Sequence, residues 1–168
     1  MTWLLLIVFI VFLAIVFICV RRVLLIFSGS RLLRISGGML FVANAFVALT
    51  AVAGGITLAT GVDRFPAVWL TGTPFGSYLV PGLILAVVVG GSAVVAAAAT
   101  LRSRQAGALS SMLAGAIMLG WLAGERLILP PAAFPPQLWW LEAVYVAAGL
   151  MMVLPPVVVW WAGGRRLA

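Results

Sequence analysis

Five long apolar runs occupy most of this chain, and most of the charged residues stand between or beside them. Of its 168 residues, 65% are hydrophobic and only 8% are charged, whereas about a quarter of the residues in a typical soluble domain are charged. A run of about 20 apolar residues is long enough to cross a bilayer as a helix. The sequence therefore predicts a single membrane domain of the all-α transmembrane class, folded as a five-helix bundle.

The five predicted spans cover nearly the whole chain. The first run is followed by Arg21 and Arg22 and has no small-residue cleavage site, so we expect a retained helix and not a secretory signal. The segment 62–77 is rich in Pro, Gly and aromatic residues, which predicts an interfacial segment in the outer headgroup region. The spans are expected at about 2–20, 36–59, 78–101, 107–129 and 138–161.

The arginines predict the direction of insertion. All ten positive residues are arginines, and eight of them fall on one side of the predicted bundle. Positive residues mark the cytoplasmic side of a membrane protein, so we expect the N-terminus outside and the C-terminus in the cytoplasm. The net charge is +7, but the arginines form no stripe on a soluble face. The charge therefore does not indicate binding to nucleic acid. The eight are Arg21, Arg22, Arg31, Arg34, Arg102, Arg104, Arg165 and Arg166.

Small residues recur at three- or four-residue spacing on three spans. Such spacing places them on one helix face, and helices in lipid associate through close packing at such faces. We expect these faces to pack the bundle, with a homo-oligomer contact through Gly120 and Gly124 as the alternative. The first span lacks such residues, so we expect it at the periphery. The series are Ala45, Ala48, Ala51 and Gly55; Gly82, Ala86 and Gly90; and Ala116, Gly120 and Gly124.

Glu125 and Glu142 lie near the facing ends of the fourth and fifth spans. Each stands about one turn inside the predicted outer boundary, so an antiparallel hairpin places both carboxylates at similar depth. Arg126 is adjacent, and Asp63 and Arg64 lie in the segment that could fold over them. One interpretation is an ion-paired cluster that joins these spans to the outer segment. The other is a site for a proton or a cation, because charged groups inside a span are costly.

The absence of histidine and the single cysteine exclude several kinds of chemistry, and the remaining polar residues indicate little. Asn44, the only asparagine, is expected to hydrogen-bond to a neighbouring helix or to line a pathway. The chain has no histidine and one cysteine, Cys19, which excludes an intrachain disulfide, His-based metal or haem ligation, and Ser-His catalysis. We therefore predict no catalytic, cofactor-binding or metal-binding residue.

Four stretches of the sequence carry a resemblance to a known family: Gly37-Gly38, Gly72 to Phe75, Tyr78 to Gly82, and Trp139 to Tyr145. From about Leu33 to Leu154 the chain resembles a family of small bacterial integral membrane proteins without an established activity. The resemblance implies a four-helix core, to which the first span is an addition, and a place in the bacterial cytoplasmic membrane.

We expect a non-enzymatic accessory or scaffold protein that acts through the lipid bilayer and through contacts with a partner membrane protein. The alternative is a small oligomeric transporter or channel subunit that uses the polar site near Glu125 and Glu142. A membrane enzyme acting on lipids is the third hypothesis, and the absence of histidine and the scarcity of acids speak against it.

Overall fold

The structure is a computed structural model that describes residues 18, 21, 31–62, 65–129 and 139–164, with the side chains of 31–34 and 158–164 left aside. The described residues form helices and turns without a strand, and four stretches are long and apolar enough to cross a membrane. This confirms an all-α fold that fits a multi-pass membrane protein. The expected first span, 2–20, lies outside the described residues, so the count of five stays a prediction.

Four of the expected spans correspond to helical stretches. The second is α2 (Arg31–Thr60), and the fourth and fifth are α5 (Arg104–Ile128) and α6 (Trp139–Gly164). The third is built from three consecutive helical pieces, which are α3 (Leu79–Leu83), the π-helix η2 (Ile84–Gly90) and α4 (Gly91–Thr100). Between α2 and α3, a short 3-10 helix, η1 (Ala67–Leu70), interrupts the segment expected at the interface.

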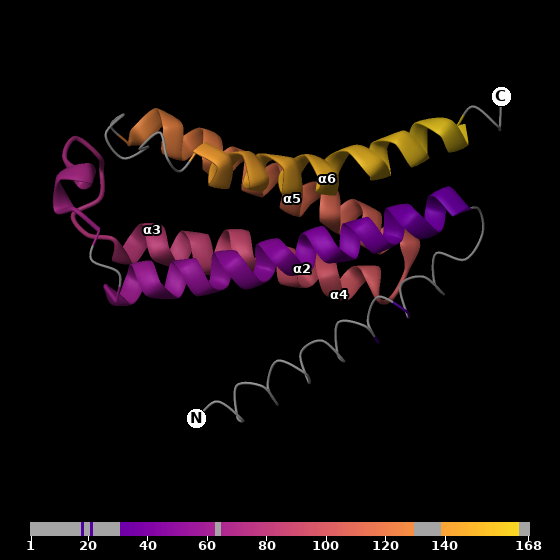
Figure 1. Cartoon of the computed structure of the whole chain (residues 1–168), viewed down its shortest axis with the longest axis horizontal. Helices are drawn as coiled ribbons and strands as arrows, with labels where there is room; N and C mark the ends of the chain where they lie inside the picture. The colour runs from indigo at the N-terminus through magenta and orange to yellow at the C-terminus, as the bar shows by residue number, and fades with distance from the viewer. Residues whose placement is uncertain (1–17, 19–20, 22–30, 63–64, 130–138, 165–168) are drawn as a thin grey trace.

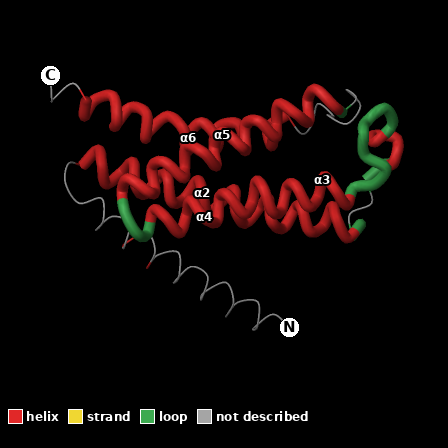
Figure 2. The backbone as a smooth tube through the Cα atoms, turned by 180° about the vertical axis from the view of Figure 1, so that it is seen from behind, coloured by secondary structure: helices red, strands yellow, loops and turns green. Residues whose placement is uncertain are grey.

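The helices form two antiparallel pairs (Figure 1). One pair is α2 with the third span, and the other is α5 with α6. We call the end of the bundle with the segment 61–78 the loop end, and the end with the short connection Leu101–Ser103 the turn end. Seen from behind, the α4–α5 connection and the C-terminal end of α6 lie at the same end of the molecule (Figure 2). All four spans therefore run alternately between the two ends.

Glycines bring α2 and the third span into backbone contact. A Cβ atom built on Gly55 would lie 2.5 Å from the Gly82 carbonyl oxygen and 2.5 Å from the Ala86 nitrogen. One on Gly82 would lie 2.7 Å from the Gly55 carbonyl oxygen, and one on Gly90 would lie 2.6 Å from the Val52 side chain. The series Gly82, Ala86 and Gly90 thus faces α2 in the first half of the third span.

The π-helical turn explains how that series stays in line. In an α-helix of 3.6 residues per turn, residues spaced by four drift around the axis by about 40° at each step. A π-helix has wider turns, with hydrogen bonds from i to i+5. Because η2 spans Ile84–Gly90, its smaller rotation per residue compensates for the rotation that an α-helix would accumulate between Gly82 and Gly90. The regular helix expected here would have rotated Gly90 away from α2.

A second close approach joins α5 to α6. A Cβ atom on Gly115 would lie 2.9 Å from the Gly149 carbonyl oxygen, and one on Gly149 would lie 2.8 Å from the Leu119 side chain. The α4–α5 connection is similarly tight, because a Cβ on Gly107 would lie 2.8 Å from the Thr100 Cα. Ser103 caps α5 there by accepting a hydrogen bond from the Ala106 N–H.

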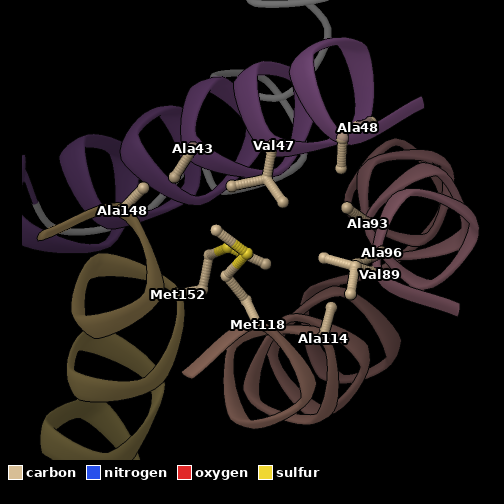
Figure 3. Packing of buried hydrophobic residues seen from close by; sticks show 11 residues of the cluster. Ala43, Val47, Ala48, Val89, Ala93, Ala96, Ala114, Met118, Ala148 and Met152 are labelled. Carbon is tan, nitrogen blue, oxygen red and sulfur yellow. The ribbon is translucent and has the colours of Figure 1, made fainter. Parts of the chain in front are cut away.

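The two helix pairs meet in a core of small and flexible side chains. Met118 of α5 and Met152 of α6 face each other at its centre, with Val47 and Val89 opposite (Figure 3). Among the described residues, α5 has no buried residue after Met118, and α6 has none before Ala148. The core therefore lies in the middle and toward the turn end. Its members are Ala43, Val47, Ala48, Ala51, Val89, Ala93, Ala96, Ala114, Met118, Ala148 and Met152.

Large apolar side chains cover the outside of the bundle. On α2 alone, Ile35, Val42 and Leu49 are 61%, 53% and 59% exposed. Water would penalise such a surface, whereas lipid chains are as apolar as these side chains. The exposed face of α2 thus fits contact with lipid.

Candidate functional site

The charged residues predicted near the ends of two spans meet at the loop end. Arg126 lies in the last turn of α5 and Glu142 in the first turn of α6. The Arg126 Nε–H donates to Glu142 Oε1 at 2.6 Å, and its Nη2–H donates to Glu142 Oε2. This two-point contact matches the planar guanidinium to the carboxylate. The pair is half-exposed, with side chains 49% and 28% accessible, so it positions the hairpin more than it stabilises it.

Glu125 lies beside this ion pair and not in it. Its half-buried carboxylate is within hydrogen-bonding reach of the Trp121 indole, one turn earlier on α5. The Glu142 carboxylate is close enough to interact with it electrostatically. The described part of the loop end thus gathers two carboxylates and one guanidinium, as their predicted equal depth requires. The site for a proton or a cation expected at Glu125 and Glu142 stays a prediction.

The described residues of the outer segment, 65–77, contact one another and the start of α3. Asp63 and Arg64 lie outside the described residues, so their expected fold over Glu125 remains a prediction. The described part of the segment packs on itself, because Tyr78 Oη donates to the Pro66 carbonyl at 2.8 Å. The ring of Phe65 lies 6.0 Å from that of Trp69 and 5.8 Å from that of Tyr78, centroid to centroid.

Asn44 forms a second polar site near the turn end of the core. Its side chain is 0% exposed, and its Nδ2 group donates to the Leu40 carbonyl at 2.6 Å and to Ser111 Oγ at 2.8 Å. The second bond joins α2 to α5, which is the interhelical contact that we expected of this residue. Asn44 Oδ1 is buried and has no hydrogen-bond partner among the described residues.

Sequence reasoning missed Ser111 and Thr100, which are also 0% exposed. The sequence contained a pattern that could have identified Ser111. It lies four residues after Gly107 and four before Gly115, so it shares the close-packing face of α5. Thr100 packs against Gly107 and donates to the Ala97 carbonyl at 2.6 Å. In the part of the chain that the structure describes, the buried polar side chains are Asn44, Thr100 and Ser111.

An apolar barrier separates the two polar sites. Ser111 and Glu125 are 14 residues apart on α5, or about 21 Å at the helical rise. Between them lie Ala114 and Met118, which are 1% and 2% exposed. Leu85, Trp121 and Tyr145 pack on the loop side of the core. Buried apolar side chains therefore lie between the Asn44 site and the Glu125 site.

The predicted packing residues divide into two groups. Gly82, Ala86 and Gly90 contact α2, as described above. Gly120 and Gly124 contact none of the other described helices, because no described atom lies within 4 Å of a Cβ built on either. Ala116, one turn earlier, is exposed. Among the described residues, the fourth span packs inside the fold through Gly115 instead, and the contact of the Gly120–Gly124 face with another chain stays a prediction.

No protein-family model, curated protein or solved structure matches the chain. The family resemblance inferred from the residue pattern therefore stays a prediction. Among the described residues, no group of three or more His, Cys, Asp or Glu side chains could hold a metal ion.

Proposed function

We propose that this chain is a non-enzymatic scaffold of a bacterial cytoplasmic membrane that binds a transmembrane helix of a partner protein along α5. The supporting observation is the open face at Gly120 and Gly124. Six other glycines of the described spans lie so close to a neighbour that a Cβ would come within 3.0 Å of it. They are Gly55, Gly82, Gly90, Gly107, Gly115 and Gly149.

The open face has the shape that a partner helix requires. Ala116, Gly120 and Gly124 follow at four-residue spacing, and the exposed side chains of Leu113 and Leu127 flank them at 64% and 87%. Backbones approach most closely at such residues, and van der Waals contact then drives association in lipid. The six glycines in close contact with a neighbouring helix hold the fold together. Two glycines on one helix face without such a contact therefore favour a contact with another chain.

The apolar core between the two polar sites favours this function over transport. A transporter needs an aqueous route to its binding site, and polar groups mark such a route inside a span. Here Ala114 and Met118, which lie between the two sites on α5, are buried and apolar. A half-exposed ion pair at the loop end is compatible with a structural link between α5 and α6.

The proposal is tested by comparing two glycine variants that are equally free of internal contacts. A Cβ on Gly124 or on Gly91 meets nothing within 4 Å, so Gly124→Leu and Gly91→Leu should both leave the fold intact. We expect Gly124→Leu to reduce co-purification of the partner in mild detergent at least tenfold, about 1.4 kcal/mol. Gly91→Leu should leave it unchanged.

Mass spectrometry of the purified complexes provides the measurement. Equal recovery of every bound protein with the two variants would contradict the proposal. If the one component lost with Gly124→Leu is a second copy of this chain, the face forms a homo-oligomer and the scaffold function is wrong.

We further propose five spans, with the N-terminus outside and the C-terminus in the cytoplasm. The support is that the turn end carries Arg102 and Arg104 as well as the start of α2, where Arg31 and Arg34 lie. Eight arginines then share the side on which positive residues accumulate.

Impermeant thiol reagents test this orientation in intact cells. In a Cys19→Ser background, Thr71→Cys places a thiol in the exposed loop-end segment, and Ser103→Cys places one in the exposed α4–α5 connection. We expect reagent added outside to label the first and to label the second only after the cells are lysed. The reverse pattern would overturn the orientation and leave the bundle unaffected.

A further inference from the structure

We propose that the buried amide of Asn44 binds one water molecule inside the bundle, isolated from bulk solvent. The inference is independent of the scaffold function. It begins with the orientation of the amide. Oxygen and nitrogen of an asparagine amide are assigned from the surrounding hydrogen bonds. Here the Leu40 carbonyl oxygen lies 2.6 Å from one amide atom, and two acceptors would repel each other at that distance. The atom facing Leu40 is therefore the nitrogen.

This assignment leaves Asn44 Oδ1 in need of a donor. The Ser111 hydroxyl accepts from the amide nitrogen at 2.8 Å, so it lies on the nitrogen side. No described residue donates to Oδ1, although Asn44 is 0% exposed. A buried acceptor without a partner is costly, and the cost rises in a membrane because lipid supplies no donor. A water molecule is the smallest donor that can satisfy it.

The surroundings offer further partners for such a water. Ser111 Oγ and Thr100 Oγ1 each retain acceptor capacity after the hydrogen bonds described above, since a hydroxyl oxygen has two lone pairs. Thr100 packs on Gly107, which lies one helical turn, or about 6 Å, before Ser111 on α5. A bound water usually has two to four partners, and this cluster can supply them.

The chemistry of the cluster favours a neutral ligand. An amide oxygen and two hydroxyls carry no charge, and a buried cation needs a compensating carboxylate. The described carboxylates, Glu125 and Glu142, lie beyond the apolar barrier at the loop end. The site is thus suited to water and not to sodium.

Radiolytic hydroxyl-radical footprinting tests the proposal in the whole protein in detergent micelles. Radicals formed from a bound water modify the side chains beside it. We expect modification of the peptide containing Leu40, Phe41 and Asn44, because Leu40 and Phe41 lie four and three residues before Asn44 on the same face of α2 and are only 2% and 6% exposed. Met118 and Met152 provide the internal control, since they are 2% and 0% exposed and methionine is oxidised readily. They should stay unmodified. Asn44→Leu should reduce the Leu40–Phe41 signal several-fold.

Each alternative result overturns the proposal. Without modification at Leu40 and Phe41 in the unaltered protein, the site is dry. If Met118 and Met152 are modified to the same extent, bulk water enters and the ligand is not isolated. A higher melting temperature in sodium chloride than in choline chloride of equal ionic strength would identify a cation. The unaltered protein decides all three, so the proposal remains testable if Asn44→Leu does not fold.

Discussion

Replacing Gly55 by alanine should lower the free energy of unfolding by about 3 kcal/mol, the upper range for inserting one methyl group into a filled core. The new Cβ would lie 2.5 Å from both the Gly82 carbonyl oxygen and the Ala86 nitrogen. Both are backbone atoms of the third span, so no rotamer change can relieve the contact. The two helices must separate, and the contacts from Gly82 to Gly90 are lost with them.

The adjacent glycine provides the control. A Cβ on Gly54 would meet only a Leu85 methyl carbon, at an ordinary 3.8 Å. Alanine is favoured over glycine inside a helix by about 1 kcal/mol, so Gly54→Ala should be neutral or stabilising. Unfolding in mixed micelles, followed by far-UV circular dichroism, measures both variants. Equal effects at the two positions would show that α2 and the third span do not touch as described.

Met152→Ala should cost about 2 kcal/mol, near the lower limit for a methionine truncated in a core. Met152 is 0% exposed and meets Met118 where the two helix pairs join (Figure 3). In a membrane the separated helices still place this side chain in lipid, so the transfer part of the usual cost is absent. What remains is the cavity and the contacts that its lining loses.

Met151 supplies a control with the same residue type at the neighbouring position. It is 41% exposed, and its side chain faces the surroundings of the bundle. Met151→Ala should change the free energy of unfolding by less than about 0.5 kcal/mol, as for other surface substitutions. The same micelle titration measures both variants. If Met151→Ala proved as harmful as Met152→Ala, the assignment of the core face of α6 would be wrong.

The sequence by itself determined the membrane class and the approximate spans. The mean hydropathy of a helix indicates whether lipid or water surrounds it. The thickness of the bilayer sets the length of every span. The second expected span, 36–59, therefore lies within α2 (Arg31–Thr60) and ends one residue before the end of that helix. Helical rise also sufficed to bring Glu142 level with Arg126, because a short hairpin fixes the register of its two helices.

Only the tertiary structure decided which face of each span meets another helix. A helix that is apolar all round carries no directional signal in its hydropathy, so spacing alone marked Gly120 and Gly124 while Gly115 makes the contact. The same holds for the Asn44–Ser111 hydrogen bond, which links residues 67 positions apart. Rotation of a helix about its axis leaves its lipid exposure nearly unchanged, and only contacts with particular neighbours fix it.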